Sequence, residues 1–365
     1  SQFDTTVVSL TESERTRDGE RAMRDLGVDV ETVETNRSSM EAVGWSLLGR
    51  KPYRAAKFGS RAFTRTVRRV LAAGDFDLVW AHFLESVATL PESPAPTVVL
   101  DQHNAEQTYW ESFSDGAVPV RLYACLNVRF LDRFQRAYRD RIDAVVSVDE
   151  TDAGEARSWA QAPVVVVPNG VDTETFSPTT VPSACSETVL FVGSLDVRMN
   201  EEALSWFVSE AWPDVRTRVP EAKFRIVGRN PTDRITALSM EPGVDVVGGV
   251  DDVVPYYDEA SVFVAPFSFG GGTKLKVLEA LAMERQLVTT PVGIKGIDVV
   301  DGEHGLVRGR GPEFSRAVSD RLKAPEDRLG AAGRSLVTAN YSWEQVYEDG
   351  IERSLAEIRR QSGPD

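Results

Sequence analysis

The stretch SVFVAPFSFGGGTKLKVLEALAMERQLVTT, residues 261–290, predicts a strand, a glycine loop, a helix and a second strand. Residues 261–266 form a short apolar, β-branched run, and residues 286–290 form another. Between them, three glycines precede a segment at 274–283 whose apolar residues recur at helical spacing. Alternating strands and helices of this kind build parallel sheets, so the stretch predicts an α/β fold.

The junction between the first strand and the helix predicts a phosphate site. Gly270, Gly271 and Gly272 allow the backbone to approach a ligand closely and to adopt positive φ angles. The helix start that follows offers unpaired N–H groups and the positive end of the helix dipole. Lys274 and Lys276 add full charges there, in a chain that otherwise favours arginine. This combination suits phosphate oxygens; the alternative is a plain strand–helix turn with solvated lysines.

Two more glycine junctions are predicted in the same half of the chain. One predicted strand ends at Gly193 and another at Gly228. Right-handed crossovers place the carboxyl ends of parallel strands on one edge of a sheet. The three junctions would therefore meet at one edge, which favours a nucleotide-sized ligand. Glu279, one turn inside the helix, is placed to accept hydrogen bonds from a ribose.

Composition narrows the class of protein. The 365 residues predict two domains of ordinary size, and no apolar run approaches the roughly 20 residues of a membrane span. Acidic residues outnumber basic ones 56 to 41, for a net charge of −15, which argues against a nucleic-acid partner. An acidic chain poor in lysine also resembles proteins of salt-loving cells. Two cysteines without metal-type spacing favour a reducing compartment, and three histidines predict no multi-histidine metal site.

The domain boundaries follow from a change in composition. Residues 173–187 are rich in Pro, Ser and Thr and predict a linker between 1–172 and 188–342. Residues 343–365 predict a final amphipathic helix and a short tail. A doubly wound sheet usually opens with a strand that runs through a glycine turn into a helix. The first predicted strand of this sequence is not part of such a unit. We therefore expect the chain to be truncated at its amino end.

Polar residues also follow a strand in the first half. The strand at 97–100 runs directly into Asp101, His103 and Glu106. Open α/β sheets place their sites at the carboxyl ends of parallel strands, so His103 is either functional or a structural histidine. Arginine stripes at 54–68 and 129–139 are either solvated helix faces or surfaces that dock on anionic lipid.

Six motifs carry a resemblance to a known family. They are HNAEQ (103–107), VVVVPNGVDTETFSP (164–178), LFVGSLDVRMNEEALSWFVSEAWPDVR (190–216), FRIVGRNP (224–231), VVGGVDDVVPYYDEASVFVAPF (246–267) and GGGTKLKVLEALA (270–282). Together they resemble the GT-B glycosyltransferases of glycosyltransferase family 4 over nearly the whole chain. The resemblance implies two Rossmann-like doubly wound domains facing a cleft, with the last helix crossing back toward the first domain.

The resemblance also implies the chemistry. Residues 188–342 would bind a nucleotide-diphosphate sugar and residues 1–172 a glycan or lipid-linked acceptor. The sugar would be transferred with retention, without a covalent protein nucleophile, a cofactor or a required metal. The implied setting is cell-surface polysaccharide or glycoprotein biosynthesis in the cytoplasm, with peripheral contact at the inner membrane face as a further expectation.

The resemblance assigns roles to particular residues. His103, Lys274 and Lys276 would be catalytic, with the cations stabilising the departing diphosphate. The residues implied for the nucleotide-sugar are Gly193, Ser194, Arg198, Gly228, Arg229, Val250, Gly271, Gly272, Thr273, Leu275 and Glu279.

Three positions depart from the family pattern. Gly271 replaces the first glutamate of the usual pair, Ser194 replaces an arginine and Met199 replaces a lysine. These changes suggest a variant branch. They leave open two alternatives: a nucleotide-sugar epimerase of GT-B fold, and an inactive binding or scaffold protein. A dehydrogenase is disfavoured because no G-x-G-x-x-G follows the first strand with an acidic residue about 20 positions later.

Overall fold

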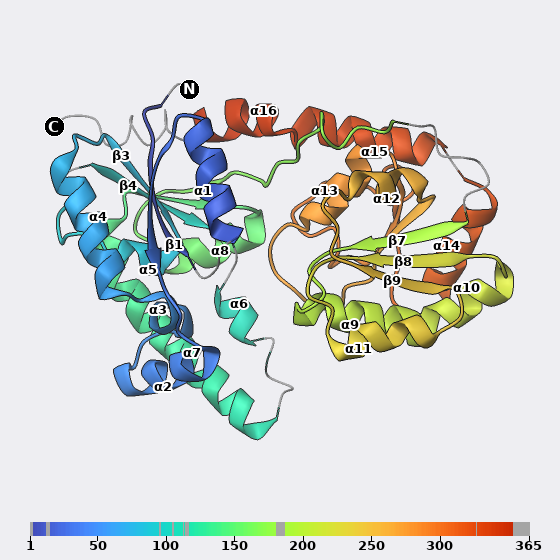
Figure 1. Cartoon of the computed structure of the whole chain (residues 1–365), viewed down its shortest axis with the longest axis horizontal. Coiled ribbons are helices and arrows are strands. Elements are labelled where there is room, and N and C mark those ends of the chain that lie inside the picture. Colours follow the sequence, from blue (N-terminus) through green and yellow to red (C-terminus); the bar gives the residue numbers. More distant parts are fainter. Residues whose placement is uncertain are drawn as a thin grey trace. The chain divides into compact units, whose positions relative to one another are not determined.

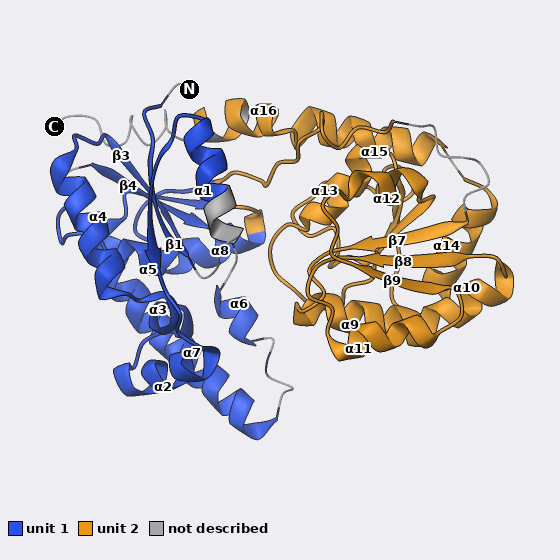
Figure 2. Ribbon diagram, viewed as in Figure 1, with its two compact units in different colours: residues 1–147, 151–165, 358–365 blue, residues 148–150, 166–357 orange. Residues whose placement is uncertain are grey.

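The computed structural model describes residues 3–11, 15–94, 96–103, 106–111, 113, 117–179, 187–325 and 327–352. The chain forms two compact units, coloured separately in Figure 2. The first consists of residues 1–147, 151–165 and 358–365, and the second of residues 148–150 and 166–357. A β-bridge joins Val171 to Ser342, so the residues just before the predicted linker associate with the second unit.

A parallel sheet forms the centre of the second unit. Its strands are β7 (Thr188–Val192), β8 (Lys223–Val227), β9 (Val244–Gly248), β10 (Val262–Ala265), β11 (Gln286–Thr289) and β12 (Leu306–Val307). Their order is β12-β11-β10-β7-β8-β9. The chain runs outward from β7 to β9, returns to pair β10 with β7, and then runs outward the other way. The direction of winding therefore reverses between β7 and β10, as in a doubly wound fold.

Helices cover both faces of this sheet. They are α9 (Arg198–Trp206), the π-helix η2 (Phe207–Ala211), α10 (Trp212–Arg218), α11 (Asp233–Ala237), η3 (Leu238–Met240), α12 (Val254–Glu259), α13 (Leu275–Ala282), α14 (Pro312–Lys323), α15 (Asp327–Asn340), α16 (Trp343–Gln345) and the π-helix η4 (Val346–Glu352). Figure 1 shows α9, α10 and α11 on one face and α12, α13 and α15 on the other. Strand β10 is buried at all four positions, which explains its uninterrupted apolar sequence.

The first unit contains two separate groups of strands. Strands β1 (Thr6–Thr11) and β2 (Asp29–Glu34) form a parallel pair. Strands β3 (Leu78–His82), β4 (Thr97–Gln102), β5 (Ala144–Ser147) and β6 (Val164–Val166) form a sheet in that order. A core that includes Val98, Leu100 and Val145 packs around the four-stranded sheet.

The first unit contains helices that sequence reasoning did not predict, and one predicted helix that is divided. Its helices are α1 (Arg15–Asp25), α2 (Ser39–Gly49), α3 (Tyr53–Phe58), α4 (Arg61–Ala73), α5 (Leu84–Val87), α6 (Glu106–Glu111), α7 (Val118–Tyr138), η1 (Arg139–Arg141) and α8 (Glu150–Trp159). The arginine stripe at 54–68 implied one continuous helix from Arg54 to Leu71, which is wrong because the chain leaves the helix at Gly59 and Ser60. Gly59 has extended backbone angles, and the Ser60 hydroxyl caps the new helix by accepting from the Phe63 N–H.

Some sequence predictions fall outside the described residues. These are Asn104 and Ala105 of the HNAEQ motif, the linker at 180–186, and the course of the last helix after Glu352. Within the described residues, no helix combines the length and hydrophobicity that a membrane crossing requires.

Candidate active site

The winding reversal in the second unit brings two predicted glycine junctions together. The loop after β7 begins at Gly193, and the loop after β10 contains Gly270, Gly271 and Gly272. Because β7 and β10 are neighbours in the sheet, both loops lie at the topological switch point. Ligands of open α/β sheets bind in the crevice outside the carboxyl ends of the strands at this point.

Lys276 lies in the first turn of α13 and is fixed by contacts from both strands. Its ammonium nitrogen donates to Asn200 Oδ1 at 2.7 Å. It also lies 4.7 Å from the ring centre of Phe191 on β7 and 5.2 Å from that of Phe267 beyond β10. Asn200 in turn donates to the Ser194 carbonyl oxygen at 2.7 Å. The side-chain amide of Asn200 thus links the loop after β7 to Lys276 at the start of α13.

Asn200 was missed by sequence reasoning. It is only 3% exposed, and it follows Val197, Arg198 and Met199 in a stretch that reads as an ordinary helix start. The available signal was a polar residue three positions inside a helix that begins after a glycine loop.

The glycines at the strand ends make the close packing of these loops possible. A Cβ atom added at Gly193 would meet the Lys276 ammonium, and one added at Gly228 would fall on the Gly193 carbonyl oxygen. The junctions after β7 and β8 therefore touch, as the sequence predicted. By contrast, a Cβ at Gly271 has no neighbour within 4 Å.

The surroundings of Lys276 lower the pKa of its side chain. Burial lowers the pKa of its ammonium to about 7; Glu279 acts in the opposite direction, and Lys274 lowers it further. At neutral pH the side chain is therefore divided between its charged and neutral forms. An anion bound beside it would favour the charged form, so anion binding is coupled to proton uptake.

Lys274 has a different place from the one predicted. It is 3% exposed, and its ammonium donates to the carbonyl oxygens of Gly271 at 2.8 Å and Gly272 at 2.7 Å. Gly270 and Gly272 have φ angles of +128° and +66°, in the region that favours glycine. Lys274 thus holds the glycine loop in shape, whereas Lys276 lies at the switch point itself.

Glu279 is placed one turn beyond Lys276 and is partly buried. It accepts a hydrogen bond of 2.9 Å from the hydroxyl of the buried Tyr257. Burial raises the pKa of Glu279, and the Tyr257 hydrogen bond and the Lys276 charge offset part of that rise. A half-buried carboxylate held by one donor has acceptor capacity left for a ligand hydroxyl.

The remaining predicted donor residues divide into two groups. Arg198 and Leu275 are exposed, and the Arg198 guanidinium lies 5.0 Å from the ring centre of Phe269 in the glycine loop. Thr273 has a buried hydroxyl with no hydrogen-bond partner among the described residues. Two others lie beyond the neighbouring strands: exposed Arg229 follows β8, and half-buried Val250 follows β9.

The predicted histidine of the first unit also has close neighbours. His103 follows β4, and its Nε2 lies 2.9 Å from Nδ1 of His82, the last residue of β3. Asp101 Oδ2 lies 3.2 Å from His82 Nδ1 and 3.5 Å from His103 Nε2. His82 and the following Phe83, whose φ of +63° is unusual for a residue with a side chain, were not singled out from sequence.

Glu106 lies near this cluster at the start of α6. Burial, with a further contribution from Glu85, raises the pKa of Glu106 to about 7. Its Oε1 atom has no hydrogen-bond partner among the described residues. Burial also lowers the pKa of His103, so the imidazole is neutral near pH 7.

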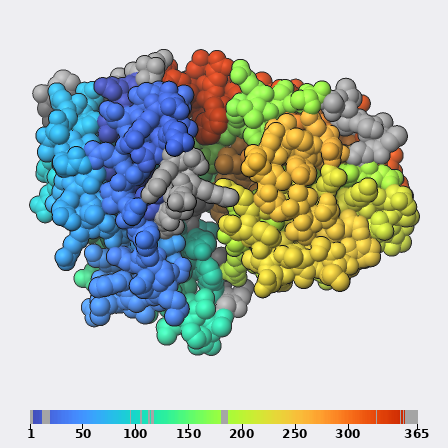
Figure 3. Space-filling view, in the orientation of Figure 1, coloured from blue at the N-terminus to red at the C-terminus, as the bar shows by residue number. Residues whose placement is uncertain are grey.

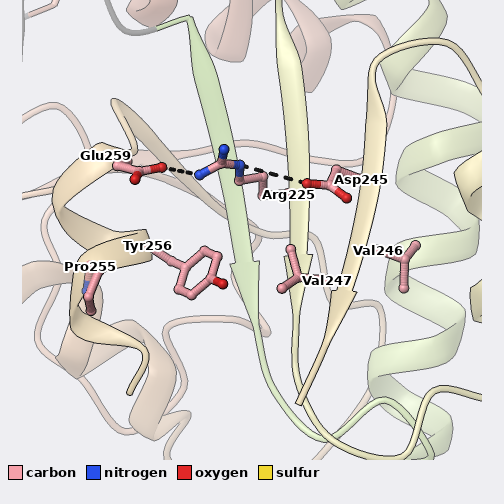
Figure 4. A pocket seen from close by; sticks show the side chains of 7 residues that line it. All are labelled: Arg225, Asp245, Val246, Val247, Pro255, Tyr256 and Glu259. Carbon is pink, nitrogen blue, oxygen red and sulfur yellow. Dashed lines mark hydrogen bonds and ion pairs between the residues drawn. The ribbon is translucent and has the colours of Figure 1, made fainter. Parts of the chain in front are cut away.

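A cavity of about 640 Å³ lies elsewhere in the second unit (Figure 4). Its lining comes from β8, β9 and α12 and includes Val247 and Tyr256. Arg225 extends between Glu259 and Asp245 and forms ion pairs with both. None of the residues predicted to bind a nucleotide-sugar lines it, so the switch point remains the candidate site.

Two Rossmann-like units, one with a lysine and glycine loops at its switch point, define the GT-B class of fold. A model of glycosyltransferase family 4 matches residues 17–175, and a model of glycosyl transferases group 1 matches residues 186–323. The chain belongs to glycosyltransferase family 4 and is a glycosyltransferase.

Curated relatives agree with this assignment. A GDP-mannose-dependent α-(1-6)-phosphatidylinositol monomannoside mannosyltransferase of Mycobacterium tuberculosis is 29% identical over 310 residues, covering 77% of this chain and 76% of the relative. An uncharacterised 44.6 kDa protein of the cps region of Klebsiella pneumoniae is 23% identical over 289 residues, covering 75% and 72%.

Solved structures share the fold. Sucrose-phosphate synthase from Thermosynechococcus elongatus is similar with a TM-score of 0.68 at 15% identity, covering 98% of both chains. HepE from Anabaena, solved in complex with UDP and glucose, has a TM-score of 0.65 at 13% identity, covering 97% of this chain and 100% of HepE. The predicted GT-B fold is thus confirmed.

Proposed function

We propose that the protein transfers a sugar from a nucleotide-diphosphate sugar to a glycan or lipid-linked acceptor with retention of configuration. The observation that carries the proposal is the position of Lys276. Its ammonium lies between the carboxyl ends of β7 and β10, where a doubly wound sheet binds nucleotides, and it is bonded to Asn200.

In this proposal the second unit stabilises the leaving group. Negative charge develops on the diphosphate as the bond between the sugar and its β-phosphate breaks. Lys276, protonated when the diphosphate binds, and the first amides of α13 would neutralise that charge without reorganising. Glu279 would accept from a ribose hydroxyl, and Lys274 would keep the glycine loop in its binding conformation.

The first unit would hold the acceptor. His103 is neutral near pH 7 and can accept a hydrogen bond from an acceptor hydroxyl. A mannosyltransferase relative acts on a phosphatidylinositol mannoside, which supports a lipid-linked acceptor as one of the two classes.

A screen of nucleotide-sugars tests the proposal. The full chain would be incubated with UDP-, GDP-, dTDP- and ADP-sugars, together with lipid-linked and soluble glycan acceptors, and the products followed by mass spectrometry. We expect nucleoside diphosphate to be released with one donor, and the sugar to appear on an acceptor. A changed sugar on an intact nucleotide would instead indicate an epimerase. Binding of nucleotide without either product would indicate a scaffold protein.

We further propose that α2 places the first unit on anionic membrane. Its side chains Met40 and Leu48 are 86% and 79% exposed, and Trp45 and Leu47 are exposed as well. A cavity of about 330 Å³ beside the end of α2 is lined by Arg50, Lys51 and Arg133, and by aromatic residues of α7. Apolar side chains beside cations match the acyl and phosphate layers of an anionic bilayer. Figure 3 shows the segment that includes α2 at the surface.

This surface shares Arg133 with the stripe at 129–139 but otherwise differs from the arginine stripes expected from sequence. Several of those arginines have local partners: Arg54 pairs with Glu85 at 2.8 Å, and Arg136 pairs with Asp132 at 2.9 Å. Arg68 donates to the carbonyl oxygens of Thr89 and Leu90. The exposed apolar residues of α2 are therefore the better membrane contact.

Liposome flotation tests the membrane proposal. The double variant Met40→Ser/Leu48→Ser should float several-fold less than the wild type with vesicles containing 30% phosphatidylglycerol, since about 0.8 kcal/mol is lost per buried methylene. Met240→Ser is the matched control, because Met240 is 84% exposed on the second unit. Equal flotation of wild type and double variant, or equal binding to neutral vesicles, would contradict the proposal.

A further inference from the structure

A closed triangle of ligand atoms lies at the carboxyl ends of β3 and β4. Its corners are His82 Nδ1, Asp101 Oδ2 and His103 Nε2. Its sides measure 2.9 Å between the two nitrogens, and 3.2 and 3.5 Å from the oxygen to the nitrogens of His82 and His103. The register explains the arrangement, because His82 is paired with Asp101 across the two strands and His103 follows two residues later.

Hydrogen bonding alone leaves this triangle incomplete. With Asp101 ionised and both imidazoles neutral, at most two protons are present on the three atoms. If both nitrogens carry protons, the two N–H groups oppose each other across 2.9 Å. If only one does, a lone pair of the other imidazole faces the carboxylate oxygen. Every neutral-imidazole arrangement therefore keeps one repulsive side.

A cation removes that repulsion. Ligand atoms bound about 2.0–2.1 Å from a zinc ion at tetrahedral angles lie roughly 3.4 Å apart, and at octahedral angles roughly 2.9 Å apart. The sides of the triangle fall within or next to this range. The imidazole planes are within 5° of parallel and the ring centres are 5.1 Å apart, so the two nitrogens face each other and one ring must turn to share an ion. The His82 side chain is 60% exposed and has room to turn.

The surroundings match a metal site. Asp101 is held by the indole N–H of Trp80, which donates to Oδ2 at 2.9 Å, and a donor that holds a carboxylate in this way orients it toward a metal ion.

We propose that His82, Asp101 and His103 bind one divalent transition-metal ion, with Zn²⁺ as the probe. Two imidazoles and one carboxylate are the ligand set that such ions prefer over Mg²⁺ and Ca²⁺. Three protein ligands leave coordination positions for water or for an oxygen of another molecule. The site lies in the first unit and shares His103 with the acceptor contact proposed above, but metal binding is measured without any sugar transfer.

Titration of the full chain after chelator treatment tests the site. Calorimetry with Zn²⁺ at pH 7 should show one strong site per chain, and Co²⁺ should give visible absorption bands of a nitrogen- and oxygen-ligated ion. His82→Asn should weaken binding at least ~10-fold, and His82→Asn/His103→Asn should abolish it. His304→Asn is the matched control, because His304 lies in the second unit beside Glu303.

The binding results expected with a metal site differ from those expected without one. Because His82 is largely exposed, its variant is expected to keep the wild-type thermal stability in the absence of metal, which a melting curve checks. Tight Zn²⁺ binding lost in the His82 and double variants but kept in His304→Asn supports the site. Zn²⁺ binding that is absent from the wild type, or equal in the wild type and the double variant, overturns it.

Discussion

Lys276→Ala is expected to weaken the binding of UDP or GDP by roughly 10- to 100-fold. A hydrogen bond to a charged group contributes about 1.5–3 kcal/mol, and a partly buried diphosphate would lose its main cation at the switch point. The Asn200 carbonyl that Lys276 contacts would also lose its donor. Calorimetry with the nucleoside diphosphate that the donor screen selects measures the change.

The control and the pH profile make this prediction specific. Lys223→Ala removes an exposed lysine of the same unit and should leave affinity unchanged. In the wild type, nucleotide affinity should fall about tenfold per pH unit above pH 7. The pKa of Lys276 is about 7 in the protein without nucleotide, so above that pH its amine must gain a proton when the anion binds. The Lys276→Ala variant should lack this slope. Wild-type affinity in the variant would rule out Lys276 as the diphosphate cation.

Gly193→Ala should reduce nucleotide affinity ~10-fold or more while the chain remains folded. The added methyl group would meet the Lys276 ammonium, so the lysine must leave its position beside Asn200. The substitution acts on the same interaction as Lys276→Ala, and the double variant should therefore be little worse than either single one. Nucleotide titration of the three variants measures the coupling.

Gly309→Ala is the matched control at an exposed glycine of the same unit. Its methyl group has open space and its backbone does not need the left-handed region, so affinity and melting temperature should stay close to those of the wild type. If Gly193→Ala binds as tightly as Gly309→Ala, the close packing of the lysine against the first loop is not needed for binding.

The fold of the second unit was predictable because its signals are local. Apolar β-branched runs end in glycine, and amphipathic helices follow them, so the alternation of strands and helices could be read directly. The meeting of the loops after β7 and β10 required one general rule, the handedness of crossovers. The position of the winding reversal was not encoded in any one segment and emerged from the order of strands.

The directions of the side chains in the candidate sites could not be predicted from the sequence. Lys274 and Lys276 are two residues apart at a helix start, and their identical charge gave no reason to separate them. The structure turns Lys274 back onto the carbonyl oxygens of Gly271 and Gly272, a contact that depends on the path of the glycine loop. In the first unit, His82 and His103 are 21 positions apart and meet only through the pairing of β3 with β4. A count of histidines could not reveal that contact.

The lowered basicity of Lys276 has a practical consequence. A neutral amine is a nucleophile, whereas the ammonium of an ordinary surface lysine is not. The burial that lowers this pKa also shields the amine, so acylating or aldehyde reagents at neutral pH would reach it only where the surrounding loops admit them. Protonation of the amine by a bound nucleoside diphosphate would remove its nucleophilicity, so nucleotide should protect Lys276 from such a reagent.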